Sequence, residues 1–131
     1  MISAPLLQYP NFQKRFISTT DASDYAIGAI LSQGQENNDL LIAYANRILN
    51  DVERNYSVIE KGALGIVWAC KHFRPFLMGP HFNIYTEQRS LTQLFNIENP
   101  GSRITRWKFL LAEFDYIIHY KPGRKTKMLI F

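Results

Sequence analysis

The sequence predicts an α/β protein with a mixed five-stranded sheet and helices packed on it. Two observations lead to this fold class: three strand-like segments joined by short polar turns, and then an alternation of helix, strand, helix and strand. The 131 residues fit one domain. Hydrophobic residues make up 47% and charged residues 20%, which indicates a globular protein with a core and excludes a disordered chain.

The first three strands are expected over residues 16–20, 26–32 and 40–45. Residues 21–24 form a polar turn between the first two, and residues 34–39 are rich in Gly, Asn and Asp, which tolerate turn conformations. Two tight connections in succession predict an antiparallel meander. Residues 1–15 are expected to be a linker that precedes the domain.

The clearest helix follows the third strand and carries one apolar stripe. Pro75 and then Gly79 and Pro80 are expected to end it. Gly62 and Gly65 lie inside it, and each costs roughly 0.5–1 kcal/mol relative to alanine. The stripe has the helical spacing 4, 3, 4, 3, 4 and consists of Ile59, Ala63, Ile66, Cys70, Phe73 and Leu77.

The second half alternates helices with strands. A fourth strand over residues 82–86 follows the long helical crossover, so it is expected to run parallel to an earlier strand. A short helix over residues 90–95 comes next, and Ser102 is expected to cap a helix over residues 103–113. Residues 114–120, rich in aromatic and β-branched side chains, are expected to form the fifth strand.

The net charge of +4 comes from the end of the chain. Residues 103–131 hold seven Lys and Arg against Glu113 and Asp115. A basic end on a neutral body is a candidate contact for a nucleic-acid backbone. A solvated basic tail explains the charge equally well.

No apolar run is long enough to cross a membrane and the start lacks the layout of a signal peptide. The single cysteine, Cys70, suits a reducing compartment. We therefore expect an intracellular protein, cytoplasmic or nuclear, that is neither secreted nor membrane-bound.

Two acidic residues follow strands that are expected to be neighbours. Asp21 comes after the first strand and Glu87 after the fourth, so a parallel fourth strand would bring their carboxylates together. Carboxylate oxygens are ligands that Mg²⁺ prefers. The alternative for Asp21 is a turn residue bonded to its own backbone, and the local pattern by itself favours that alternative.

Several segments resemble, in the same order, the ribonuclease H domain of gypsy-type long-terminal-repeat retrotransposon polyproteins. The resemblance runs from about residue 4 to residue 123, and residues 5–10 resemble the link that follows the polymerase part. The segments that carry it are TDASDYAIGAILSQ (20–33), IAYA (42–45), NYS (55–57), IEK (59–61), WACKHFRPFL (68–77), SRITRW (102–107), EFDY (113–116) and YKPG (120–123).

The resemblance implies the ribonuclease H fold and cleavage of the RNA strand of RNA–DNA hybrids during reverse transcription. In the family four carboxylates hold two Mg²⁺ ions, which activate a water and stabilise the leaving oxygen. It further implies two partners, an RNA–DNA hybrid or other nucleic acid and the polymerase domain of a parent polyprotein.

Carried over residue by residue, the family's metal ligands are incomplete. Asp21 matches the first acid, Gly62 stands at the position of a Glu, and Glu87 stands at the position of an Asp. The last Asp has no counterpart, since residues 124–131 read RKTKMLIF and depart from the family pattern. We therefore expect a degenerate, C-terminally truncated copy, with a domain over residues 16–123 and an aberrant tail over residues 124–131. Cleavage is expected to be impaired, and whether the chain acts as an enzyme stays open.

Two other hypotheses stay open beside the impaired nuclease. One is a non-catalytic nucleic-acid-binding or interaction module that keeps the fold. The other is an active nuclease that completes its site with Glu87, Glu60 or Asp115. Glu60 should point away from the site, however, because it lies two residues before Gly62 and side chains two residues apart on a helix point about 200° away from each other. The basic residues expected to contact nucleic acid are Arg103, Arg106, Lys108, Lys121, Arg124 and Lys125.

Overall fold

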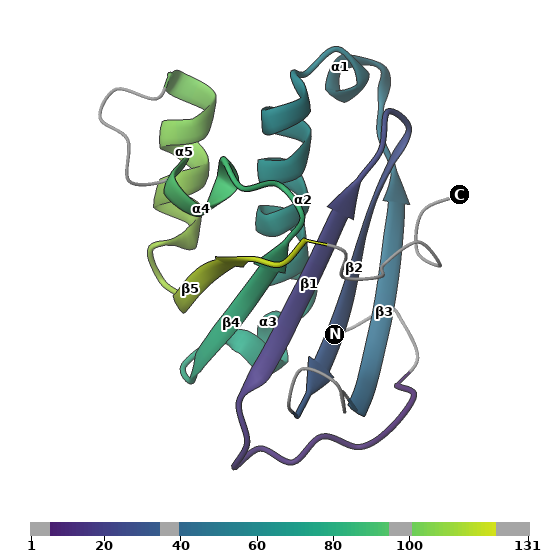
Figure 1. Cartoon of the computed structure of the whole chain (residues 1–131), viewed down its shortest axis with the longest axis vertical. Helices are drawn as coiled ribbons and strands as arrows, with labels where there is room; N and C mark the ends of the chain where they lie inside the picture. The colour runs from purple at the N-terminus through teal and green to yellow at the C-terminus, as the bar shows by residue number, and fades with distance from the viewer. Residues whose placement is uncertain (1–5, 35–39, 95–100, 123–131) are drawn as a thin grey trace.

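The fold is a five-stranded mixed sheet with its helices on one face (Figure 1). The computed structural model describes residues 6–34, 40–94 and 101–122. The strands lie in the order β3-β2-β1-β4-β5. Their bounds are β1 (Phe16–Ala22), β2 (Ala26–Gln33), β3 (Leu40–Ile48), β4 (His81–Thr86) and β5 (Asp115–Tyr120). The helices are α1 (Asp51–Arg54), α2 (Val58–His72), α3 (Arg74–Leu77), α4 (Leu91–Leu94) and α5 (Ser102–Leu111).

Strand directions follow from the lengths of the connections. β1 pairs with β2 and β2 with β3 in antiparallel fashion, and only a few residues separate the strands of each pair in the sequence. β4 pairs with β1, and β5 with β4, in parallel fashion, each after a helical crossover. The predicted fold class, the meander and the parallel fourth strand are therefore confirmed.

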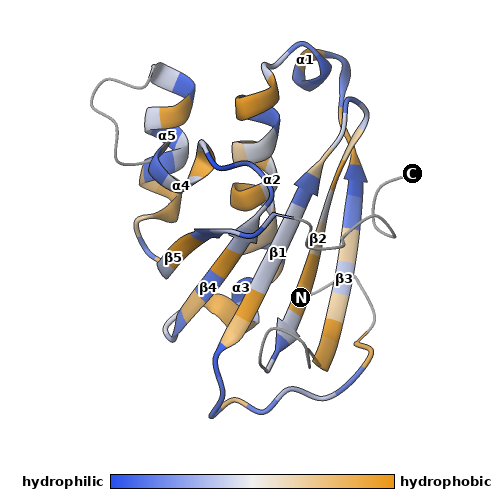
Figure 2. Cartoon of the chain, in the orientation of Figure 1, coloured by the Kyte–Doolittle hydropathy of each residue, from blue (hydrophilic) through white to orange (hydrophobic). Residues whose placement is uncertain are grey.

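The core lies between the sheet and α2. Orange, the colour of hydrophobic residues, appears along α2 and on parts of β1, β2 and β4 (Figure 2), and the buried core cluster draws on the same elements. Five of the six residues of the predicted stripe are fully buried, with 0% of their surface exposed, and Ile59 is the exception at 39%. Ile59 lies in the first turn of α2, so the buried part of the stripe begins at Ala63. The fully buried stripe residues are Ala63, Ile66, Cys70, Phe73 and Leu77.

The long apolar stripe is divided between two helices. α2 ends at His72, and α3 begins at Arg74 with a proline in its first turn. Pro75 has no N–H to donate to the carbonyl of Lys71, so the helical ladder stops there. The chain then restarts, and the amide N–H groups of Phe76 and Leu77 donate to the carbonyl of Phe73 at 2.9 and 3.1 Å.

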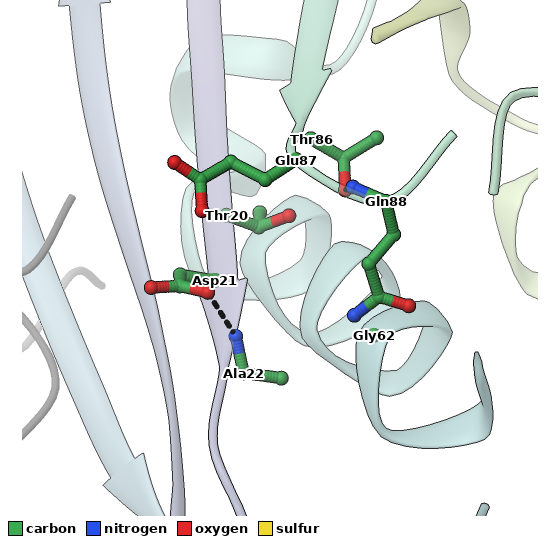
Figure 3. A pocket seen from close by; sticks show the side chains of 7 residues that line it. All are labelled: Thr20, Asp21, Ala22, Gly62, Thr86, Glu87 and Gln88. Carbon is green, nitrogen blue, oxygen red and sulfur yellow. Dashed lines mark hydrogen bonds between the residues drawn. The ribbon is translucent and has the colours of Figure 1, made fainter. Parts of the chain in front are cut away.

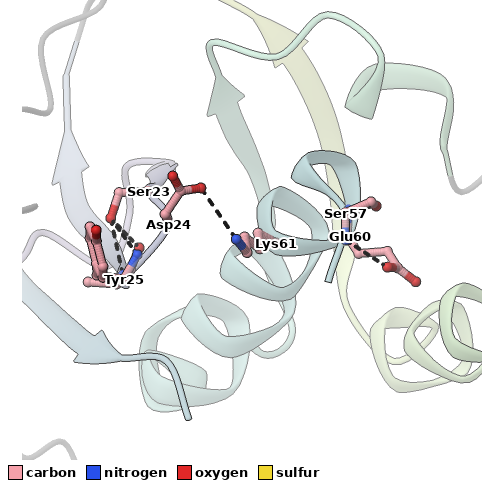
Figure 4. A network of polar contacts seen from close by, with 7 residues as sticks. Ser23, Asp24, Tyr25, Ser57, Glu60 and Lys61 are labelled. Carbon is pink, nitrogen blue, oxygen red and sulfur yellow. Dashed lines mark hydrogen bonds and ion pairs between the residues drawn. The ribbon is translucent and has the colours of Figure 1, made fainter. Parts of the chain in front are cut away.

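The first strand is longer than the sequence predicts. β1 continues through Asp21 and Ala22, where Asp21 pairs with Gly28 of β2, so Asp21 is a strand residue and the prediction of a turn there is wrong. The turn begins at Ser23, whose hydroxyl oxygen accepts hydrogen bonds from the amides of Tyr25 (3.2 Å) and Ala26 (3.1 Å), as Figure 4 shows. A serine hydroxyl can replace a backbone acceptor in this way and sets where the turn starts.

Two helix starts also differ from the sequence prediction. Gly101, with φ of 96°, is the cap of α5, and Ser102 is the first helical residue and makes no capping hydrogen bond with its side chain. The sequence pattern does not predict α1, because four residues carry no periodicity. Its signal is the pair Asn50 and Glu53, which form a capping box with side chain to backbone distances of 2.8 and 2.9 Å.

Residues 6–15 are joined to the edge of the meander. The amide of Leu7 donates to the carbonyl of Ile42 at 2.7 Å. The side-chain amide of Gln33 donates to the carbonyls of Asn11 and Lys14 at 2.7 and 3.2 Å. Within the ranges that the structure describes, no helix has the length and apolar character needed to cross a membrane.

A polar cluster fastens α5 to the start of α2. Ser57 and Glu60 form a capping box (Figure 4), and the Glu60 carboxylate also accepts from the Arg103 guanidinium of α5 at 2.7 Å. The same guanidinium lies 4.0 Å above the Tyr56 ring. The hydrogen bond from the backbone of Ser57 and the Arg103 guanidinium hold the pKa of Glu60 below its ordinary value of 4.5.

This lowered pKa predicts a loss of stability in acid. The unfolded chain binds a proton at Glu60 more readily than the folded chain, so the stability contribution is present above pH 4.5 and is lost as the pH falls through the lower folded-state pKa. Glu60→Gln is therefore expected to lower the melting temperature at pH 7 by about 2–4 °C. It is also expected to reduce how steeply the melting temperature falls between about pH 5 and pH 3. Thermal unfolding followed by circular dichroism measures both, and Asp51→Asn, at an exposed carboxylate, controls for the loss of one charge. An unchanged slope for Glu60→Gln would contradict the prediction.

Candidate functional site

The candidate site is a small pocket where β1 and β4 end beside α2 (Figure 3). The parallel register pairs Thr19 with Tyr85. Asp21 and Glu87, each two residues further along the chain, therefore lie side by side. The space that water can enter is about 10 Å³, which is room for about one molecule. The pocket is lined by Thr20, Asp21, Ala22, Gly62, Thr86, Glu87 and Gln88.

The pocket brings the two predicted acids together. Asp21 is half-buried, and one of its carboxylate oxygens accepts from the amide of Ala22 at 2.9 Å. Glu87 is exposed and follows the last residue of β4. Both carboxylates lie on the same side of the pocket in Figure 3. The sequence argument from adjacent strand ends therefore placed this pair correctly.

The opposite wall of the pocket is α2 at Gly62, the position where the sequence resemblance implies a glutamate. The amide group of the Gln88 side chain lies against this glycine (Figure 3). A β-carbon at Gly62 would lie 2.7 Å from Nε2 and 3.0 Å from Oε1 of Gln88, and 2.8 Å from Cδ1 of Leu91. The sequence pattern does not single out Gln88, because its effect depends on a helix residue far from it in the chain.

Glu60 does not line the pocket. Its carboxylate binds Ser57 and Arg103 on another side of α2, as the helical geometry predicts. Asp115, the other acid considered, begins β5 and lies 2.9 Å from Nδ1 of His81, at the end of these strands away from the pocket. Neither residue completes the pair of Asp21 and Glu87.

The acidic residues do not match a site for two metal ions. The oxygen donors of Asp21 and Glu87 suit Mg²⁺, but in the described part of the chain no group of three or more His, Cys, Asp or Glu side chains is placed to hold a metal ion. The donor set present therefore falls short of the four carboxylates that the family implies.

Beside the pocket lies a lysine that is unusually buried. The Lys61 side chain is 9% exposed, and its ammonium group lies 3.4 Å from a carboxylate oxygen of Asp24, whose side chain is 78% exposed (Figure 4). A cleft of about 60 Å³ adjoins this pair and is bordered also by Ala22, Ser23 and Val58. The ion pair connects α2 to the turn after β1.

The predicted basic residues are spread over several surfaces. Arg103 is bound to Glu60, whereas Arg106 and Lys108 are exposed on α5. Lys121 follows β5, where its amide donates to the carbonyl of Thr86 at 2.9 Å, so it lies near the pocket. Arg124 and Lys125, and the segment 124–131, lie outside the described residues.

One basic residue near the pocket is missing from the sequence prediction. Arg89 follows Gln88, is exposed, and holds its guanidinium 4.8 Å from the centre of the Tyr120 ring, next to Lys121 in the chain. The charge count of residues 103–131 does not include it. Arg89 and Lys121 come from different parts of the sequence, and each is adjacent in the chain or hydrogen-bonded through its backbone to a residue that lines the pocket.

Comparison with known proteins places the chain in a family. The model of the RNase H-like domain found in reverse transcriptase matches residues 11–114. The retrovirus-related Pol polyprotein from transposon 297 of Drosophila melanogaster is 44% identical over 128 residues, which are 98% of this chain and 12% of that polyprotein. The transposon Tf2-3 polyprotein of Schizosaccharomyces pombe is 34% identical over 94% of this chain and 10% of its own length. The chain thus spans only about a tenth of these relatives.

Solved structures share the fold at low sequence identity. The foamy viral protease-reverse transcriptase in complex with RNA/DNA hybrid matches 92% of this chain and 17% of its own, with a TM-score of 0.72 and 16% identity. LC11-RNase H1 in complex with RNA/DNA hybrid matches 88% of this chain and 91% of its own, with a TM-score of 0.62 and 11% identity. The sheet and its helices therefore form an RNase H-like fold. Together with the family match and the relatives of high identity, this means that the chain belongs to the RNase H-like domains of reverse transcriptases in retrotransposon Pol polyproteins.

Proposed function

We propose that this chain is a catalytically impaired RNase H-like domain from the reverse transcriptase of a gypsy-type retrotransposon, and that it still binds RNA–DNA hybrid. One observation supports the impairment above all. The pocket at the ends of β1 and β4 is lined by two carboxylates, those of Asp21 and Glu87, and the facing position on α2 is Gly62.

The chemistry of the reaction explains why this matters. In the family two Mg²⁺ ions supply the activated water and stabilise the leaving oxygen. Each ion demands near-octahedral oxygen ligands at short distances. Glu87 is one methylene longer than aspartate, and about 1 Å of misplacement can cost about a hundredfold in rate. Two acids, one of them displaced, therefore give a poor site for this reaction.

Retained binding rests on different features. Arg89 and Lys121 lie near the pocket, and Arg106 and Lys108 are exposed on α5. The foamy viral enzyme and LC11-RNase H1, which share this fold, were solved with RNA/DNA hybrid. Contacts from basic side chains to phosphates supply affinity that does not depend on the metal ligands.

The first test is cleavage of an end-labelled RNA–DNA hybrid in Mg²⁺ and, separately, in Mn²⁺. We expect no cleavage in Mg²⁺ above that of the Asp21→Asn variant. Asp115→Asn, at the far end of the strands, controls for the loss of a carboxylate elsewhere on the surface. Cleavage in Mg²⁺ by the unchanged chain, abolished by Asp21→Asn and kept by Asp115→Asn, would refute the proposed impairment.

The same preparation tests binding by fluorescence anisotropy at several salt concentrations. We expect the logarithm of the binding constant to fall linearly with the logarithm of the salt concentration. Arg89→Gln and Lys121→Gln are each expected to reduce the slope by about one, while Lys71→Gln, at the other end of α2, leaves it unchanged. Absence of hybrid binding would refute the retained function.

The second candidate is a binding module with no catalytic role. The Gln88 side chain against Gly62 favours it, because that contact fills the place of a metal-binding side chain. Slow cleavage in Mn²⁺ that depends on Asp21 would identify an impaired nuclease. Hybrid binding with no cleavage in either metal would identify the module.

A further inference from the structure

The pocket contains an unexplained contact between α2 and the chain after β4. Gly62 is a costly residue within a helix, since glycine there is about 1 kcal/mol less favourable than alanine. The space beside Gly62 is nevertheless occupied, because Nε2 of the Gln88 side chain lies only 2.7 Å from the position that a β-carbon would take. Contacts between a real β-carbon and a neighbouring heavy atom essentially never fall below 3.0 Å.

The backbone of Gln88 is fixed beside α2. The amide of Gln88 donates to the hydroxyl oxygen of Thr86 at 3.1 Å, and the Thr86 side chain is itself buried, with 4% of the residue exposed. Leu91, one turn further along the chain, is 1% exposed and lies under the same glycine. The segment from Thr86 to Leu91 therefore closes against α2 from outside.

We propose that Gln88 is the residue that shuts this pocket, and that Gly62 and Gln88 form a compensating pair. The glycine leaves space beside α2, and the longer glutamine side chain occupies that space. A side chain at residue 62 must displace the end of the Gln88 side chain and also Cδ1 of Leu91. A carboxylate at residue 62 and the Gln88 carboxamide therefore compete for the same space, and shortening Gln88 removes that competition. This inference rests on the proposed loss of a metal-binding carboxylate at Gly62.

A matched glycine makes the claim testable. Gly65 lies one turn further along α2, and a β-carbon there would meet Ile27 at 3.7 and 3.8 Å and the Asp21 carbonyl oxygen at 3.9 Å. These are ordinary van der Waals distances. Gly65→Ala thus brings the same gain in helix propensity without a collision, and it is remote from the Gln88 amide.

The decisive experiment is a double-mutant cycle on the full chain, measured by thermal unfolding. The effect of Gly62→Ala on the melting temperature is expected to be more favourable in the Gln88→Ala background than in the unchanged chain, by at least about 4 °C. The contact with Leu91 is present in both backgrounds, so it cancels in the cycle. Gly65→Ala is expected to raise the melting temperature by a similar amount in both backgrounds. Equal effects of Gly62→Ala in both backgrounds would refute the compensating pair.

The functional consequence is measured with Mn²⁺ as the probe. The double variant of Gly62→Glu with Gln88→Ala is expected to gain about 3–5 °C in melting temperature from about 10 mM MnCl₂, and to lose that gain when Asp21→Asn is added. Gly62→Glu alone is expected to show a smaller gain, because the Gln88 carboxamide competes for the same space. If Gly62→Glu alone responds to Mn²⁺ as strongly as the double variant, Gln88 does not shut the pocket.

These outcomes are separate from those of the cleavage assay. Hybrid cleavage by the unchanged chain would refute the proposed impairment, whatever the cycle shows. A cycle without coupling, in a chain that does not cleave, would refute the role of Gln88 and leave the impairment standing.

Discussion

Phe82→Ala is expected to lower the free energy of unfolding by about 3–5 kcal/mol. Phe82 lies on β4, between β1 and β5 in the sheet, and none of its surface is exposed. Its ring packs at centroid distances of 6.2 Å from Phe114 and 6.3 Å from Tyr116. Because the strands around it cannot close over a cavity of this size, the loss of apolar burial and the cavity itself both reduce stability.

Urea unfolding followed by tryptophan fluorescence measures this effect. The control is Phe109→Ala on α5, where the phenylalanine is 75% exposed and the change is expected to stay within about 0.5 kcal/mol. Since small domains are stable by about 5–15 kcal/mol in total, the Phe82 variant should be close to unfolding at about 37 °C. Equal shifts of the midpoint in the two variants would show that Phe82 does not lie in a packed core.

The thiol of Cys70 is expected to be inert in the folded protein. Cys70 lies on the buried stripe of α2 with 0% of its surface exposed, and burial raises the pKa of its thiol to about 12. An exposed cysteine has a pKa of about 8.5, so at about pH 8 the reactive thiolate fraction is lower by about three orders of magnitude. Reaction then requires the protein to open.

Modification by a disulfide reagent that releases a coloured thiolate measures the difference. We expect the rate at Cys70 to be at least about 1,000-fold slower in buffer than in guanidinium chloride. Ser90→Cys places a second thiol at an exposed position just before α4, which gives a fast internal reference in the same molecule. If both thiols of that variant react at one rate under native conditions, the burial of Cys70 is refuted.

The contact between Gly62 and Gln88 bears on how this domain departs from its family. The proposed replacement of a helix glutamate by glycine at residue 62 would remove a metal ligand and leave a space beside the pocket. In this chain the Gln88 amide occupies that space. Under the proposed pairing, Gly62→Glu alone adds a side chain that competes with the Gln88 amide, so we expect the larger response to metal when both residues are changed.

Much of the fold can be predicted because its signals are local. The stripe from Ala63 to Leu77 repeats every three or four residues, and the turns after the first two strands are marked by serine, aspartate, asparagine and glycine. Errors fall where a single contact decides a boundary. The Ser23 hydroxyl starts the turn two residues later than expected, so Asp21 stays in β1. The end of the long helix near Pro75 is expected from the sequence, and α2 does end at His72.

The candidate site is predictable only in part. The parallel direction of β4 follows from the long crossover, so the meeting of Asp21 with Glu87 can be inferred from the order of helices and strands along the chain. Arg103 shows the limit of the same reasoning. Its charge marks it as a candidate phosphate contact, but it is bound to Glu60, 43 residues earlier in the chain.

The fold class and the family resemblance can be predicted from short segments, because periodicity, turn chemistry and motif identity are all held within short stretches of chain. The contact of Gln88 with the space beside Gly62, the binding of Arg103 by Glu60 and the position of Arg89 and Lys121 close to the pocket come from the folded chain. The physical reason is that these contacts join residues from different elements. Their distances depend on strand register and helix packing, which no local pattern encodes.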